Sequence, residues 1–250
     1  NLTISDSAIV KDQNDSVGSI GVGAFIGYPQ ASSVITLNGC TLTNSSVEGG
    51  HWTGGLIGIA GGHSTVHMAL TITGCSVTDS TIKGAGSVGG AIGHAINDAN
   101  TEATITGTTI TGNTIISTGS STNKAGAVMG TVGAAETTLN AAVSGNKVTS
   151  GTNAENCIFG RFGTSKGILS ITGGSYDSVN IIPDDFPGGN SFKISDGVFT
   201  GAKPFGDPAA TVFNGLEISG GTFNQEVPNG EVPNGPCAVG YIPYDNKDGT

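Results

Sequence analysis

A short motif of glycine and bulky apolar residues recurs through the first 160 residues of the chain. It reads GVGAFIG at 21–27, TGGLIG at 53–58, VGGAIG at 88–93, AGAVMG at 125–130 and NCIFG at 156–160. The closing glycines are 31, 35, 37 and 30 residues apart, and a period of about 20–50 residues is typical of solenoids, propellers and other repeat arrays. The motif lacks the heptad periodicity and the helix formers of helix-pair repeats, so we expect a repeat built from strands.

Each repeat carries two further apolar runs, both rich in β-branched residues at alternate positions. The first run is VITLNGC (34–40), LTITGC (70–75), ATITGT (103–108), AAVSGN (141–146) and LSITGG (169–174), and the second is TLTNSSV (41–47), SVTDSTI (76–82) and TITGNTI (109–115). Three short strands separated by turn residues make one coil of a β-solenoid. The sequence therefore predicts an all-β, right-handed parallel β-helix with three short strands per coil.

The last third of the chain repeats at a shorter interval. Two sets of residues recur every 23 or 24 positions: Ile171, Ile194 and Ile218, and Tyr176, Phe199 and Phe223. Stacked coils would bring each set into register, so we expect the aromatic rings to form one column with a spacing of about 4.8 Å. Eight of the nine prolines lie after residue 182. We therefore place a boundary near residue 165, between a region of longer repeats (1–165) and a region of shorter, continuing coils with longer loops (166–250).

The balance of charge argues against two classes of partner. The net charge is −10 at pH 7, and Arg161 is the only arginine. Because phosphate binding needs clustered lysine and arginine, we expect no binding to nucleic acid and none to anionic membranes. The sequence shows no signal peptide and no transmembrane segment, and it opens inside a strand pattern, LTISDSAI at 2–9. We therefore expect no membrane insertion, and a chain that belongs to a larger surface protein.

Four cysteines allow three disulfide pairings or none. Cys40 and Cys75 occupy the same place in consecutive repeats, so their Cα atoms should stack about 4.8 Å apart, within the range of a disulfide. The alternative is a column of small buried thiols, because cysteine is among the most buried residue types. Both interpretations stay open, and Cys157 and Cys237 stand in unrelated contexts.

The glycine motif carries a family resemblance. GGLIG, which ends in Gly55, Leu56, Ile57 and Gly58, is similar to the GLUG motif of bacterial secreted and surface proteins, including immunoglobulin A peptidase-like and adhesin-like chains. GGAIG at 89–93 is a near match. ISGGTF at 218–223, followed by CAVGYIPYDNKDGT at 237–250, is similar to the ends of repeat modules in large surface proteins of gut bacteria. The resemblance implies an extracellular or cell-surface location and an adhesin-like architecture.

Many parallel β-helices cleave polysaccharides, and the pectin-acting hydrolases among them carry an adjacent aspartate pair, then Gly-His-Gly, then Arg-Ile-Lys. Here Asp184 and Asp185 are adjacent, but GHS at 62–64 precedes them and no Arg-x-Lys follows. The segment 181–189 is also a natural turn, since Pro-Asp-Asp and Pro-Gly-Gly both favour turns. We therefore predict no catalytic residues. The alternative is a polysaccharide hydrolase or lyase whose site would use Asp184, Asp185 and Asp196.

All four histidines, His51, His63, His67 and His94, fall within 44 residues. The spacing of His63 and His67 resembles a metal-binding pair, but no cysteine or carboxylate completes a ligand set by position. We place His63 and His67 beside a loop and His94 in an outward slot of another coil. The prediction is therefore solvent-facing histidines with no metal and no cofactor, and the alternative is a metal site at His63 and His67.

These observations favour a non-enzymatic surface module, either a rigid scaffold or a binding face for glycans or for a host or matrix protein. A further hypothesis concerns the Thr-x-Thr segments at 71–73 and 104–106, which flank an inward isoleucine, because flat threonine ladders on solenoids can order water against ice. Alignment of the repeats predicts that this ladder is broken. Other residues take the place of the first threonine elsewhere: Val34, Ala141 and Ser170.

Overall fold

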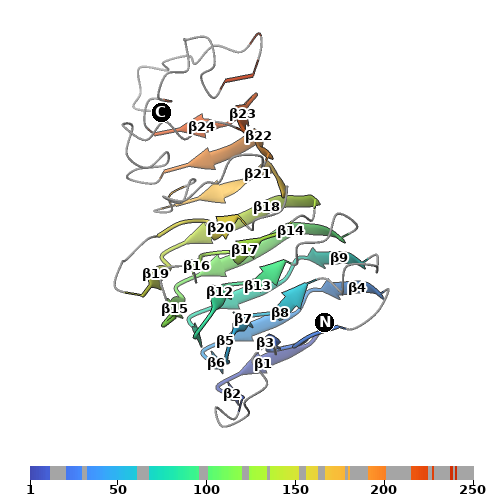
Figure 1. Cartoon of the computed structure of the whole chain (residues 1–250), viewed down its shortest axis with the longest axis vertical. Helices are drawn as coiled ribbons and strands as arrows, with labels where there is room; N and C mark the ends of the chain where they lie inside the picture. The colour runs from blue at the N-terminus through green and yellow to red at the C-terminus, as the bar shows by residue number, and fades with distance from the viewer. Residues whose placement is uncertain are drawn as a thin grey trace.

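The structure is a computed structural model of the whole chain. It describes residues 1–11, 21–29, 33–60, 68–95, 101–119, 124–133, 136–151, 156–162, 167–177, 180, 191–200, 215–224, 227, 237–238 and 240. The described elements are all β-strands, and they pair in parallel with the equivalent strand of the next coil. Figure 1 shows the coils stacked from the N-terminus at one end to the C-terminal region at the other. The protein is therefore a parallel β-solenoid, as predicted.

Four sheets run along the stack. Sheet A contains β1 (Thr3–Ser5), β4 (Ser33–Asn38), β5 (Thr41–Thr43), β9 (Met68–Thr73), β10 (Ser76–Thr78), β14 (Thr101–Thr111), β18 (Glu136–Ser144), β21 (Ile168–Tyr176), β22 (Ser191–Phe199), β23 (Leu216–Ile218) and β24 (Thr222–Phe223). Sheet B contains β2 (Ala8–Val10), β6 (Ser46–Glu48), β11 (Thr81–Gly84), β15 (Thr114–Ser117) and β19 (Lys147–Ser150). Sheet C contains β3 (Gly21–Gly23), β7 (Trp52–Gly54), β12 (Ser87–Gly89) and β16 (Ala125–Gly126), and sheet D contains β8 (Ile57–Ala60), β13 (Ile92–Ala95), β17 (Met129–Val132) and β20 (Phe159–Phe162).

The prediction of three strands per coil is wrong for the longer coils. The second coil contains β4, β5, β6, β7 and β8. The three predicted apolar runs are present, but two of them break into two strands each. TLTNSSV turns at Asn44, whose backbone is left-handed (φ 45°), and TGGLIG turns at Gly55–Leu56 between β7 and β8. Each of these turns starts a new sheet, so the coil has more sides than predicted.

The turn between sheets A and B is built the same way in five successive coils. A left-handed residue comes first, at Asp6, Asn44, Asp79, Gly112 and Gly145. The next residue is a serine or asparagine, and from the second of these coils onward its side-chain oxygen accepts a backbone N–H from the coil before. The donor–acceptor pairs are Ser7 to Ser45, Ser45 to Ser80, Ser80 to Asn113 and Asn113 to Asn146, at 3.0–3.1 Å. This polar ladder satisfies backbone donors that the turn would otherwise bury without partners.

The closing glycines of the motif let sheet D lie on the backbone of sheet C. A Cβ atom added at Gly93 would lie 2.6 Å from the backbone nitrogen of Thr53, and one at Gly58 or Gly130 would overlap backbone atoms of β3 or β12. Main-chain atoms cannot move aside as a flexible side chain can, so only glycine fits at these positions. This close approach explains why the motif alternates glycine with isoleucine: Ile57 and Ile59 are fully buried on either side of Gly58.

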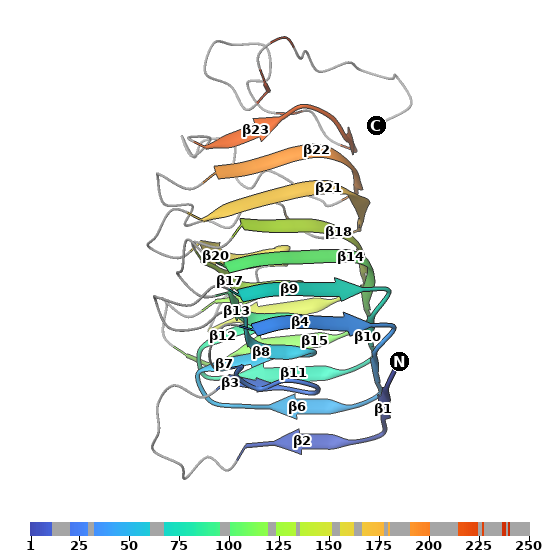
Figure 2. The same ribbon diagram turned by 90° about the vertical axis from the view of Figure 1, so that its right-hand side faces the viewer.

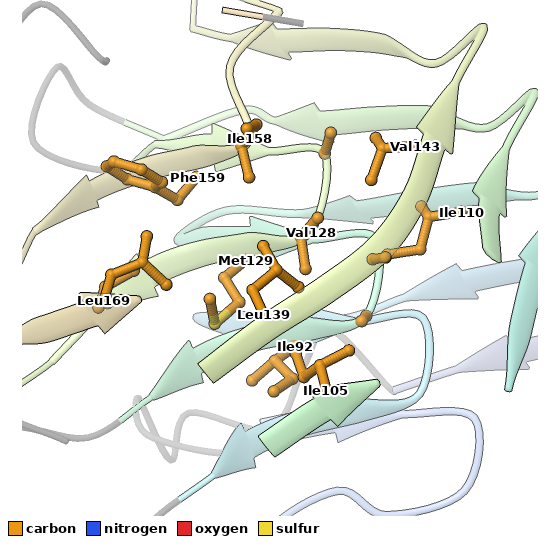
Figure 3. Packing of buried hydrophobic residues seen from close by; sticks show 14 of the residues in the cluster. Ile92, Ile105, Ile110, Val128, Met129, Leu139, Val143, Ile158, Phe159 and Leu169 are labelled. Carbon is orange, nitrogen blue, oxygen red and sulfur yellow. The ribbon is translucent and has the colours of Figure 1, made fainter. Parts of the chain in front are cut away.

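One continuous apolar cluster fills the solenoid. In Figure 3, Ile105 and Leu139 from sheet A face Ile92 and Met129 from sheet D across the interior. All four side chains are fully buried. Because every coil places a residue above its equivalent, each buried side chain packs against neighbours from the coils on both sides.

Sheet A crosses the predicted boundary near residue 165 without a break. β18 pairs with β21, and β21 pairs with β22, and Figure 2 shows these strands continuing the same stack. Sheets B, C and D have no described strand beyond β20. The boundary itself stays a prediction.

The aromatic column of the C-terminal coils is confirmed. Tyr176 pairs with Phe199, and Phe199 pairs with Phe223, at equivalent positions of successive coils. The ring centroids are 5.0 and 4.9 Å apart, and the ring planes are 10° and 7° from parallel. The Tyr176 hydroxyl donates to the Gly173 carbonyl at 3.0 Å, so the buried polar end of this column has a partner.

Cys40 and Cys75 are free, buried thiols that stack in adjacent coils. The Cys40 backbone N–H donates to the Cys75 sulfur at 3.3 Å. The Cys75 sulfur lies 3.5 Å from the carbonyl oxygens of Leu37 and Thr73. The column of buried thiols is thus the arrangement found, and Cys75 satisfies a backbone donor as the serines of the turn do.

We expect Phe199→Ala to destabilise the protein strongly, because Phe199 is the middle ring of the column and is fully buried. Truncation of a buried phenylalanine typically costs about 3–5 kcal/mol. Thermal unfolding followed by circular dichroism should show a melting temperature lower by several degrees. An unchanged melting curve would mean that the stacked rings do not support the C-terminal coils.

Thr53→Val should stabilise the protein by about 1 kcal/mol. Thr53 is fully buried between Val22 and Val88 in the column of sheet C, and its hydroxyl has no hydrogen-bond partner. A buried polar group without a partner costs about 1–3 kcal/mol, and valine removes it with little change of shape. Urea unfolding measures the difference. The matched control is Thr131→Val, which should destabilise, because the equally buried Thr131 hydroxyl is bonded to Ser87.

Candidate functional site

The residues singled out for catalysis or metal binding fall mostly outside the described residues. This is so for Asp184, Asp185, His63 and His67. Asp196 is described, and its carboxylate accepts the backbone N–H of Gly197 at 2.7 Å. Among the described residues, no group of three histidine, cysteine or acidic side chains is placed to hold a metal ion. Asp196 lies within β22, where its carboxylate is bonded to the backbone of the next residue.

The prediction that His94 faces solvent is wrong. His94 lies on β13 and is only 8% exposed. The physical reason is the contact between sheets C and D, which covers β13 from the side that an isolated coil would leave open: all four residues of β13 are buried. His51, by contrast, is exposed, as predicted.

His94 packs against the only tryptophan of the chain. The rings of Trp52 and His94 are stacked, with centroids 5.3 Å apart and planes 28° from parallel. His51 meets the same indole edge-on at 4.7 Å. Trp52 itself is half-buried at the start of β7. One aromatic ring at the surface is therefore supported from behind by a buried imidazole.

Polar residues of the following coils continue this cluster. In sheet D, His94 pairs with Thr131, and Thr131 pairs with Arg161. The Arg161 Nε–H donates to the Thr131 hydroxyl at 3.2 Å, and the Thr131 and Ser87 hydroxyls lie 2.6 Å apart. We call Trp52, Ser87, His94, Thr131 and Arg161 the Trp52 edge. The half-buried Arg161 has no carboxylate partner among the described residues.

The sequence contains a simple signal for the Trp52 edge that the predictions from sequence did not use. His94, Thr131 and Arg161 each follow directly after a closing glycine of the motif, as Ile59 does. Because residues at equivalent places stack in a solenoid, this column could have been read from the motif alone. The contribution of Trp52 and Ser87 from the facing sheet could not, because it depends on how the two sheets pack.

Burial keeps the His94 imidazole neutral. Loss of contact with water, with smaller contributions from the charges of Arg161 and His51, lowers the pKa of His94 to about 4. Its Nδ1 atom is buried and has no hydrogen-bond partner in the part of the chain that the structure describes. At neutral pH the ring therefore acts as an uncharged, flat support for Trp52.

We expect the stability of the protein to fall as the pH falls from about 6.5 to about 4. In this range the unfolded chain binds a proton at His94, with an ordinary pKa near 6.5, while the folded protein does not. The free energy of unfolding therefore falls by roughly 3 kcal/mol, and all of this fall occurs below pH 6.5. Urea unfolding at pH 7 and at pH 4 measures this loss.

His94→Ile is the variant that isolates this effect, since Ile59 occupies the equivalent position one coil earlier. The free energy of unfolding of this variant should fall less between pH 7 and pH 4 than that of the wild type, because the proton uptake at His94 is gone. His51→Gln, at an exposed histidine, is the control and should keep the difference. The account is contradicted if the wild type and His94→Ile lose the same stability on acidification.

The threonine ladder on sheet A is not broken in the way predicted. Thr71 pairs with Thr36, not with Val34. Thr104 pairs with Thr138, and Ala141 lies opposite Thr108. Only Ser170 takes the predicted place, next to Thr138. The first column of the ladder therefore holds threonine in four successive coils.

None of the described segments forms a helix with the length and hydropathy needed to span a membrane. Comparison of the chain with protein-family models, with curated proteins and with solved structures gave no match. The sites above are accordingly defined by the geometry of this chain alone.

Proposed function

We propose that this protein is a non-enzymatic module of a bacterial secreted or cell-surface protein, in which a rigid solenoid presents the Trp52 edge to glycans, free or carried by host and matrix proteins. The GLUG-like motif supports the location and the adhesin-like role. The observation that carries glycan binding is the half-buried Trp52, stacked on neutral His94. Two strands further along sheet D lies Arg161, which has no carboxylate partner among the described residues.

The two partly exposed residues of the Trp52 edge, Trp52 and Arg161, each have a counterpart in a sugar. The face of an indole ring packs against apolar C–H groups while its rim stays polar, and the C–H face of a pyranose ring suits it. Arginine binds a carboxylate through parallel N–H groups, which favours sugars that carry one. The strands that carry His94 and Arg161 are two strand spacings apart, about 10 Å. This distance is comparable to the length of a disaccharide.

The same residues argue for binding without cleavage. Glycoside hydrolysis commonly uses two carboxyl groups that flank the bond, and the Trp52 edge contains tryptophan, serine, histidine, threonine and arginine. His94, the one residue with a familiar role in proton transfer, is buried and neutral at physiological pH. The proposed role of the site is therefore recognition.

A glycan-array screen of the full chain tests the proposal. We expect the wild type to bind a subset of glycans that contain acidic sugars. Trp52→Ala and Arg161→Gln should each weaken that binding at least about tenfold, which corresponds to about 1.4 kcal/mol. Thr81→Ala, at an exposed position of sheet B, should bind like the wild type.

Two outcomes would count against the proposal. The first is a folded wild-type protein that binds no glycan on the array. The second is a set of Trp52 and Arg161 variants that bind as tightly as the wild type, which would move any glycan binding to another face of the solenoid. Circular dichroism of each variant establishes that the solenoid is still folded.

A further inference from the structure

A regular array of threonine and asparagine covers the outer face of sheet A. Figure 2 shows the strands that carry it, β4, β9, β14 and β18, stacked one above another on the side that faces the viewer. Two columns of side chains follow the pairing register of these strands. The first column is Thr36, Thr71, Thr104 and Thr138, and the second is Asn38, Thr73, Thr106 and Asn140. We call these eight residues the threonine face.

The hydroxyls of the threonine face are not bonded to one another. Among the described residues, no hydrogen bond joins the side chains of Thr71, Thr73, Thr104 or Thr106 to another protein group. The neighbouring side of sheet A differs: there the hydroxyls of Thr43 and Thr78 are 3.0 Å apart, and two further pairs of hydroxyls from adjacent coils are bonded in the same way. Both sides are rich in threonine, but on the threonine face no such hydroxyl pair joins the described coils.

The array is stiff and evenly spaced. Threonine is restricted at χ1, and the residues between the two columns anchor each strand from below: Leu37, Ile72, Ile105 and Leu139 are all buried. Neighbouring strands lie about 4.7–4.9 Å apart, and residues two apart on a strand are separated by about 6.6–6.8 Å. The face is therefore a two-dimensional lattice of polar groups that needs little ordering before it binds.

The threonine face carries no charge, although the chain has a net charge of −10. Charged side chains begin at its borders, with Glu102 and Glu136 along one side and Lys193 beyond Ser170 at the C-terminal end. A threonine hydroxyl both donates and accepts hydrogen bonds, as a water molecule does. The face thus matches an uncharged ligand whose surface groups also do both.

We propose that the threonine face binds ice. The hydroxyls of the face repeat at two regular spacings, so water molecules bonded to them are held in a regular two-dimensional array, as in the surface layer of a crystal of ice. One such contact is weak, but a crystal engages every residue of the array at once, and binding then gains from multivalency. This proposal is independent of glycan binding, because the Trp52 edge lies on sheets C and D.

Measurement of thermal hysteresis and of ice-crystal shape tests the proposal with the full chain. We expect the wild type to lower the freezing temperature below the melting temperature, by an amount that rises with its concentration, and to shape ice crystals. Thr104→Tyr places a bulky ring in the centre of the array and should abolish both effects. Thr81→Tyr, at an exposed strand position of sheet B, is the matched control and should leave both unchanged.

The proposal is overturned if the folded wild type neither separates the freezing and melting temperatures nor shapes crystals. It is also overturned if Thr104→Tyr, folded by circular dichroism, acts like the wild type. Loss of activity in both tyrosine variants, with both still folded, would show that binding does not reside on the threonine face. Glycan-array results do not affect these outcomes, so failure of either proposal leaves the other standing.

Discussion

Direct contact between the backbones of sheets C and D is the constraint on which the rest of the longer coils depends. It exists because each repeat closes with glycine, and a Cβ at Gly58, Gly93 or Gly130 would overlap main-chain atoms of the facing sheet. Main chain does not yield as side chains do, so the sheets would have to separate. The contact also covers the strands of sheet D. A residue that follows a closing glycine is therefore buried or half-buried whatever its polarity.

Polar residues buried in that contact need hydrogen-bond partners, and only some of them have one. Thr131 is bonded to Ser87 and to Arg161. His94 remains neutral and stacks on Trp52, with its Nδ1 atom unpaired. A buried polar group without a partner costs stability, so His94 contributes less to the stability of this contact than the bonded Thr131 does. The Trp52 edge thus combines a bonded pair of hydroxyls with an unbonded imidazole.

Equal spacing in the sequence predicts which residues stack above one another in successive coils. The aromatic column followed from intervals of 23 and 24 residues, and it formed as expected. The predicted break in the threonine ladder is wrong because the glycines of the aligned runs belong to different turns. Gly107 is an extra residue in β14, and the register with β18 shifts there, whereas Gly145 corresponds to Gly112 at the next turn. A glycine marks a turn but does not say which turn, so register had to come from strand pairing.

The predictions of three strands per coil and of a solvent-facing His94 are wrong for a related reason. Asn44 and Asp79 take the left-handed conformation without glycine, so no glycine marks the turn into sheet B within the runs TLTNSSV and SVTDSTI. The cover over His94 comes from a strand in another part of the coil. Periodicity along one strand carries no information about what packs on its outer side, and so the candidate site was the part of the fold least accessible to sequence reasoning.

The two proposed surfaces differ in a way that follows from the solenoid itself. Stacking places equivalent residues in columns, and each column either repeats a residue or changes it from coil to coil. The first column of the threonine face repeats threonine through four coils, so it presents the same contact again at every strand spacing. The column after the closing glycines changes at each step, from Ile59 to His94, Thr131 and Arg161. A repeating column is complementary to a lattice, whereas a column without repetition has one position at which a ligand fits, and this suits a discrete molecule such as a short acidic glycan.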